Sequence, residues 1–126
     1  GEILYSKIRP YLNKVALVKE PCLCSADVYP VAPSPEFISR EYLWLLLRSQ
    51  GFMDYVARFS NRANIPKLNR KQFAGYAAPI PPLDLQHRFA AIVESIEQQK
   101  NRQREHLAEL DSLFASLQSL AFKGEL

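Results

Sequence analysis

The sequence predicts an α+β fold, in which a small β-sheet with short helices is followed by a long C-terminal coiled-coil helix. Three observations predict it. Short segments rich in β-branched and aromatic residues occupy the first 31 residues, and two helical apolar patterns follow between residues 39 and 59. From Leu85 to Leu120, apolar and polar residues then recur in steps of four and three, which is the repeat of a coiled coil.

Three strands are predicted in the first part of the chain, separated by proline and asparagine. They are residues 3–5, 15–18 and 23–31. Pro33 and Pro35 end the sheet, because proline cannot donate to a strand ladder. Since the sequence starts at Gly1 and looks like sheet interior almost at once, we expect a preceding segment to complete this domain.

The two cysteines, Cys22 and Cys24, are too close in sequence to join distant parts of a fold. We expect two reduced, partly buried thiols. A metal site would need further ligands nearby, and His87 and His106 lie far along the chain, so no metal is expected.

Two short helices are predicted next. Ser39 is a suitable N-cap for a helix that continues to Arg48, and Gly51 is placed to end it. A second helix is expected over residues 52–59, because aromatic and aliphatic residues recur there at helical spacing. Together these helices would give the domain its core.

A polar loop, residues 60–69, follows and leads through a short turn into a proline-rich segment. Loops on a rigid scaffold commonly carry recognition residues. The prolines stiffen the junction, and Asp84 can cap the long helix beside it. We therefore divide the chain into a partial domain, residues 1–83, and a long helix, residues 84–126.

The long helix would be roughly 55 Å long, so its apolar stripe is too long to be buried by the rest of the chain. We expect a partner helix, with another copy of this chain as one candidate. The ten residues 97–106 contain no apolar side chain, and the heptad pattern alone does not choose parallel or antiparallel pairing. The stripe, here called the seam, consists of Leu85, Phe89, Ile92, Ile96, Gln99, Gln103, His106, Leu110, Leu113, Leu117 and Leu120.

Positive charge is concentrated in the first part of the chain. The formal net charge is +3, but residues 1–84 carry 11 Lys and Arg against 7 Asp and Glu. Residues 57–72 hold five basic side chains and no acidic one. This composition indicates a possible phosphate-binding surface, although an ordinary solvated surface is the alternative.

The sequence offers no catalytic constellation. It has no Gly-rich phosphate loop, no metal-ligand cluster and no nucleophile with a local base. No apolar run reaches the roughly 20 residues needed to span a bilayer. We therefore expect a non-catalytic, cytoplasmic binding module without a membrane segment.

Three segments together resemble the specificity (S) subunit of type I restriction-modification enzymes. They are GEILYSKIRPYLNK at residues 1–14, IPKLN at 65–69, and PIPPL at 79–83 followed by Gln86 and Arg88. The resemblance covers nearly the whole chain in the right order. It implies that this chain is the C-terminal target recognition domain, in part, joined to a spacer helix. A complete subunit of the family carries two such domains, each of which reads half of an interrupted DNA site.

The resemblance also implies the partners. These would be double-stranded DNA and the methyltransferase (M) and restriction (R) subunits, which would carry out methylation and cleavage and use S-adenosylmethionine and ATP. No cofactor is expected on this chain, and a homodimer through the C-terminal helix could replace the second spacer helix. The alternative is a protein-binding assembly module that dimerises through a coiled coil.

Candidate DNA-binding residues fall into two sets. In the first set, Arg62 and Asn64 are expected to contact bases, because Arg and Asn can pair bidentately with guanine and adenine. Lys67, Arg70 and Lys71 of the same set are expected to contact the phosphate backbone, and the second set is Lys7, Arg9 and Lys14. Lys67 and Asn69 could instead hold the loop in shape, and Arg9 could simply order the turn beside Pro10. The full candidate set is Lys7, Arg9, Lys14, Arg58, Arg62, Asn64, Lys67, Arg70 and Lys71.

Overall fold

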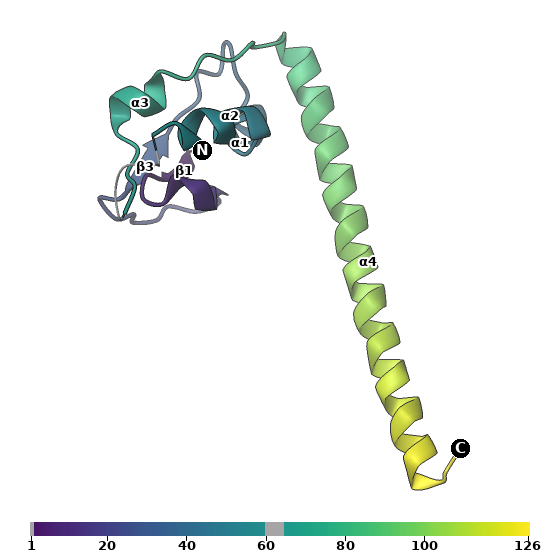
Figure 1. Ribbon diagram of the computed structural model, residues 1–126. Coiled ribbons are helices and arrows are strands. Elements are labelled where there is room, and N and C mark those ends of the chain that lie inside the picture. The colour runs from purple at the N-terminus through teal and green to yellow at the C-terminus, as the bar shows by residue number, and fades with distance from the viewer. Residues whose placement is uncertain (1, 60–64) are drawn as a thin grey trace. The chain divides into compact units, whose positions relative to one another are not determined.

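The computed structural model describes residues 2–59 and 65–126. The chain forms two compact units, the first ending at Ala90 and the second comprising Ala91–Leu126. The first unit contains a three-stranded sheet and short helices, and the second contains helix alone (Figure 1). The α+β fold class predicted from the sequence is confirmed.

The sheet is antiparallel with the strand order β2-β1-β3. The central strand β1 (Ile3–Ser6) pairs with β2 (Val15–Leu17) and β3 (Val28–Val31). The predicted third strand began too early. Residues just before Val28 form a turn, in which the Val28 amide donates to the Ser25 carbonyl at 3.0 Å, and this turn keeps them out of the ladder.

Alternation along β1 places Ile3 and Tyr5 on the buried face of the sheet, where their exposed fractions are 0% and 1%. Pro30 lies opposite Leu4 on the edge strand β3, where a residue without an N–H can be accommodated. The helices cover the buried face and complete a single cluster. Its fully buried members are Ile3, Tyr5, Leu47, Phe52, Val56 and Leu68.

Between β1 and β2 the chain makes a tight turn around the 3-10 helix η1 (Pro10–Leu12). Arg9 and Asn13 flank it with φ angles of 48° and 46°, the left-handed region that residues with a Cβ seldom adopt. The Asn13 amide donates to the Pro10 carbonyl at 3.0 Å, and the Arg9 amide donates to the Pro66 carbonyl at 2.9 Å. These bonds hold both residues in an otherwise unfavourable conformation.

Serine caps begin the first two helices. Ser39 caps α1 (Arg40–Leu47) as predicted, its Oγ accepting from the Tyr42 amide at 3.2 Å. Ser49 caps α2 (Gln50–Ala57) in the same way. The prediction that Gly51 ends the first helix was therefore wrong: it lies in the first turn of the second.

Two further helices follow the polar loop. Asn69 and Gln72 form a reciprocal capping box at the start of α3 (Arg70–Ala74), which supports a structural role for Asn69. The long helix α4 (Leu83–Lys123) starts earlier than expected, so Asp84 lies in its first turn rather than at its cap. At that position the positive end of the helix dipole still stabilises the carboxylate.

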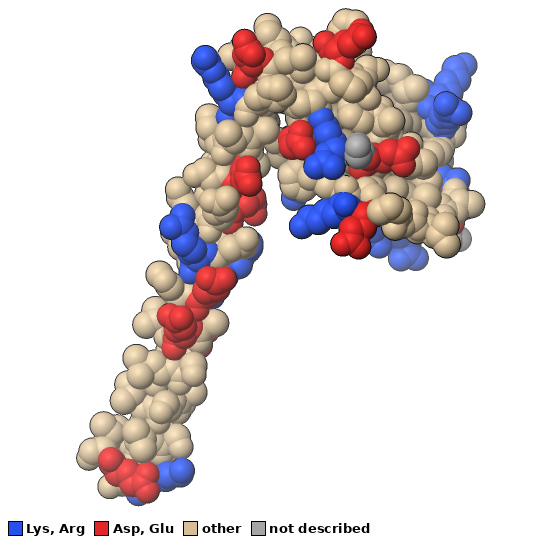
Figure 2. All heavy atoms as spheres, turned by 180° about the vertical axis from the view of Figure 1, so that it is seen from behind, with Lys and Arg blue, Asp and Glu red and all other residues tan. Residues whose placement is uncertain are grey.

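Helix α4 has 41 residues, which corresponds to roughly 60 Å. Within its second-unit part, seam residues are extensively exposed in the single chain, for example Ile92 at 59% and Leu110 at 61%. Residues 112–122 carry no charged side chain, and Figure 2 shows an uncharged surface on the helix before its C-terminal end. The helix therefore carries an apolar stripe that its own unit leaves uncovered.

The cysteine prediction was half right. Cys22 and Cys24 are both free thiols. They are also both exposed, not partly buried, because residues 19–24 follow β2 outside the sheet and are exposed throughout.

Tyr5 gives the fold a measurable pH dependence. Burial raises the pKa of its hydroxyl from 10.0 to about 12, because ionisation would place a charge in the core. As pH rises from about 10 toward 12, the unfolded chain loses this proton before the folded chain does. The free energy of unfolding should therefore fall, by roughly 1.4 kcal/mol per pH unit from this group.

Urea denaturation of the wild type and of Tyr5→Phe at pH 8 and pH 11 checks this prediction. Phenylalanine cannot ionise, so the variant should lose less stability between the two pH values. An equal loss in both proteins would contradict the assignment to Tyr5.

Candidate nucleic-acid interface

Backbone pairing brings the two candidate basic sets of the sequence together. The Leu68 amide donates to the Lys7 carbonyl at 2.8 Å, and the Arg9 amide donates to the Pro66 carbonyl at 2.9 Å. Ile8 and Lys67 form an antiparallel bridge between these two bonds. Residues 7–9, which directly follow β1, thus run beside the segment 65–68, although about 60 residues of chain separate the two.

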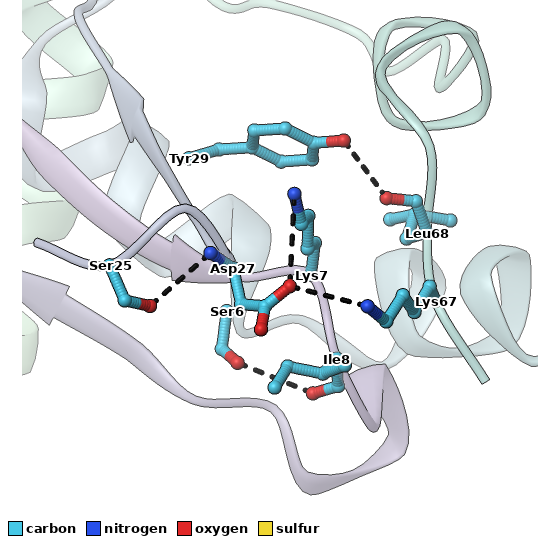
Figure 3. A network of polar contacts seen from close by, with 8 residues as sticks. All are labelled: Ser6, Lys7, Ile8, Ser25, Asp27, Tyr29, Lys67 and Leu68. Carbon is cyan, nitrogen blue, oxygen red and sulfur yellow. Dashed lines mark hydrogen bonds and ion pairs between the residues drawn. The ribbon is translucent and has the colours of Figure 1, made fainter. Parts of the chain in front are cut away.

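Asp27 lies between two of the candidate lysines (Figure 3). Its Oδ1 is 3.8 Å from the Lys7 Nζ and 3.4 Å from the Lys67 Nζ. The Lys7 amide also donates to the Asp27 carbonyl at 3.0 Å, which fixes the loop before β3 against the end of β1. Two positive charges and one negative charge leave the cluster with one net positive charge.

Both lysine side chains are at least partly exposed to solvent. The exposed fractions of the side chains are 24% for Lys7, 58% for Lys67 and 41% for Asp27. Exposed ion pairs of this kind contribute only about 0–1 kcal/mol to stability. The two ion pairs therefore add little stability, and they place the two ammonium groups near each other.

The Tyr29 side chain lies beside this cluster. Its hydroxyl donates to the Leu68 carbonyl at 3.1 Å (Figure 3), and the Lys7 Nζ lies 5.4 Å from the centre of its ring. The ring also packs against Phe73 of α3, with ring centroids 5.8 Å apart. The aromatic side chain therefore joins the basic cluster to the core.

The other described candidates occupy neighbouring elements. Lys14 is exposed, and its carbonyl accepts from the Ser6 amide at 3.1 Å. Arg70 and Lys71 are exposed in the first turn of α3, immediately after segment 65–69. Arg58 follows α2, and its guanidinium lies 5.9 Å from the Tyr55 ring centre.

Arg62 and Asn64, the residues predicted to contact bases, lie outside the described part of the chain. Their assignment stays a prediction. The described candidates form one tight group, Lys7 with Lys67, and individual members on adjoining elements.

Sequence reasoning missed the contribution of Asp27 and Tyr29 to this cluster. Asp27 is 20 residues from Lys7 and 40 from Lys67, so no local pattern joins them. The signal that existed was a strand rich in β-branched and aromatic residues ending near an acidic side chain. The partners follow from the sheet register, which the sequence did not specify.

Within residues 2–59 and 65–126, no three His, Cys, Asp or Glu side chains gather in a way that could hold a metal ion. Among the helices that the structure describes, none is long and apolar enough to cross a membrane.

Residues 1–111 match the model of the type I restriction modification DNA specificity domain. The chain belongs to this family. It is similar to the type I restriction enzyme EcoDI specificity subunit of Escherichia coli, with 36% identity over 133 aligned positions. The alignment covers 100% of this chain and 29% of that subunit, so the chain spans less than a third of its relative's length.

The Tyr29 hydroxyl should stabilise the base of the interface. Tyr29→Phe removes its bond to the Leu68 carbonyl while keeping the ring, so the free energy of unfolding should fall by about 1 kcal/mol. Urea denaturation at neutral pH measures it. Tyr11→Phe is the matched control, because the Tyr11 side chain is 54% exposed; equal effects in the two variants would argue against the bond.

Proposed function

We propose that this chain is a DNA-recognition unit of a type I restriction-modification specificity subunit, with α4 as its spacer helix. The proposal is supported most directly by the pairing of residues 7–9, directly after β1, with the segment 65–68. This pairing gathers basic side chains from two distant stretches on the domain of a chain that belongs to the DNA specificity family.

In this proposal the lysines position the domain on the DNA backbone. Lys7 and Lys67 each have an ammonium group near Asp27, and a phosphate can replace that carboxylate as their partner. Arg70 and Lys71 extend the positive surface along α3. Arg62 and Asn64 are proposed to read bases, since their side chains can make bidentate pairs.

The helix has a separate role in the proposal. Its seam pairs with a second helix, supplied in this chain by another copy, and the pair holds two recognition domains apart. We propose that methylation and cleavage belong to separate M and R subunits that dock on the assembly. The exposed apolar side chains along α4 support the pairing, since burying each one in a helix interface would contribute roughly 1 kcal/mol or more.

Replacing Lys67 and Lys71 by alanine in a complete subunit should weaken binding to every DNA sequence. If both contact phosphates, the slope of log K against log salt should become less steep by about 2, because fewer counterions are released. Fluorescence anisotropy with duplex DNA over a salt series measures the slope.

The matched control is the pair Lys100→Ala and Lys123→Ala, which removes the same charge from α4. The control should leave the slope close to that of the wild type. An unchanged slope in the Lys67 and Lys71 variant would count against the phosphate contacts.

The proposed helix pairing predicts a dimer at micromolar concentration. Leu113→Glu places a charge in the middle of the apolar seam and should raise the dissociation constant at least about ten-fold, since burying an unpaired charge is costly. Analytical ultracentrifugation measures it. Ala115→Glu, an exposed position off the seam, is the control; a monomeric wild type with an intact helix would refute the pairing.

A further inference from the structure

Gln86 is the buried polar side chain of the described residues, with an exposed fraction of 0%. Its amide is nevertheless well satisfied. The oxygen accepts from the Ser39 amide at 2.8 Å, while the nitrogen donates to the Phe37 carbonyl at 2.8 Å and the Pro81 carbonyl at 2.7 Å. Both amide protons are used, and all three partners are backbone groups.

These bonds join three segments of the first unit. Phe37 and Ser39 precede α1, and Ser39 is also the cap of that helix. Pro81 belongs to the proline-rich segment, and Gln86 lies in the first turns of α4. One side chain therefore attaches the start of α4 to the start of α1 through directional bonds.

The attachment uses one face of α4. Leu83, Gln86 and Ala90 recur at helical spacing and are at least partly buried. Leu85 and Phe89, the first seam residues, are 51% and 46% exposed. Because each residue advances a helix by roughly 100°, this seam face lies about a third of a turn from the attached face.

Apolar packing alone would not choose between the two faces. Leu85 and Phe89 are larger and more apolar than Gln86 and Ala90 of the attached face, and Phe89 already touches the Tyr42 ring, with centroids 6.2 Å apart. Rotation of α4 to bury them further would break the three hydrogen bonds that Gln86 makes with partly buried backbone groups. The hydrogen bonds therefore oppose that rotation.

We propose that Gln86 is a positioning residue that sets the rotation of the first turns of α4, so that the seam stays available to a partner helix. The inference builds on the proposed pairing of the seam and adds the element that directs it. In this proposal, the buried amide of Gln86 keeps the side of α4 that packs on the first unit distinct from the side that faces a partner helix.

The test compares Gln86→Met with the wild type in the full chain. Methionine keeps the volume and apolar stem but makes none of the three bonds. Spin labels are placed at two exposed positions of the first unit, Ala57→Cys on α2 and Arg88→Cys on α4, with Cys22 and Cys24 changed to serine. Labelled chain is diluted into unlabelled chain, and pulsed electron paramagnetic resonance gives the distribution of label distances.

The wild type should give a narrow distribution, and Gln86→Met should widen it about two-fold or shift its maximum, since a loosened support lets the helix turn. Gln98→Met, the same exchange at an exposed position of α4, should leave it unchanged. A lowered melting temperature with an unchanged distribution would overturn the proposal, because it would show a purely stabilising role.

If Gln86→Met does not fold, Gln86→Asn takes its place. It keeps the amide but is one methylene shorter, so it cannot reach all three partners, and the same widening is expected. An unchanged distribution in that variant overturns the proposal. No DNA is present in these measurements, and sedimentation reports the pairing separately, so failure of the proposed function is distinguishable from failure of this inference.

Discussion

The pairing of residues 7–9, directly after β1, with the segment 65–68 is the constraint on which the first unit depends. Its backbone bonds bury Leu68 completely in the core and, in the same step, align Lys67 with the end of β1. Stability and charge placement are thus coupled, because the polar loop cannot leave the sheet without withdrawing a core residue.

Local patterns in the sequence predicted much of the secondary structure. The seam repeat, the serine cap at Ser39 and the strand pattern of β1 each depend on residues within a few positions, so the structure confirms the elements they predict. The errors were local as well. Gly51 was interpreted as a helix end, but the competing cap at Ser49 starts the next helix before it.

For the candidate interface, only the identity of the basic residues could be predicted from the sequence. Composition identified the basic residues, but the contact between Lys7, Asp27 and Lys67 requires the sheet register and the long-range bridge at Ile8. Gln86 was noticed only as part of a motif, since an amide on a polar helix gives no local sign that it will be buried. Long-range backbone partners decide both cases, and single-sequence periodicity does not contain them.

The proline in β3 has a consequence for the addition of a further strand to this edge of the sheet. Pro30 pairs with Leu4 although it has no N–H, so its nitrogen points away from β1, toward the free side of the sheet. That border is short and lacks a donor where an added strand would need one, which discourages fibril-like growth. Edge-to-edge association through β3 is therefore disfavoured by a single residue of the strand.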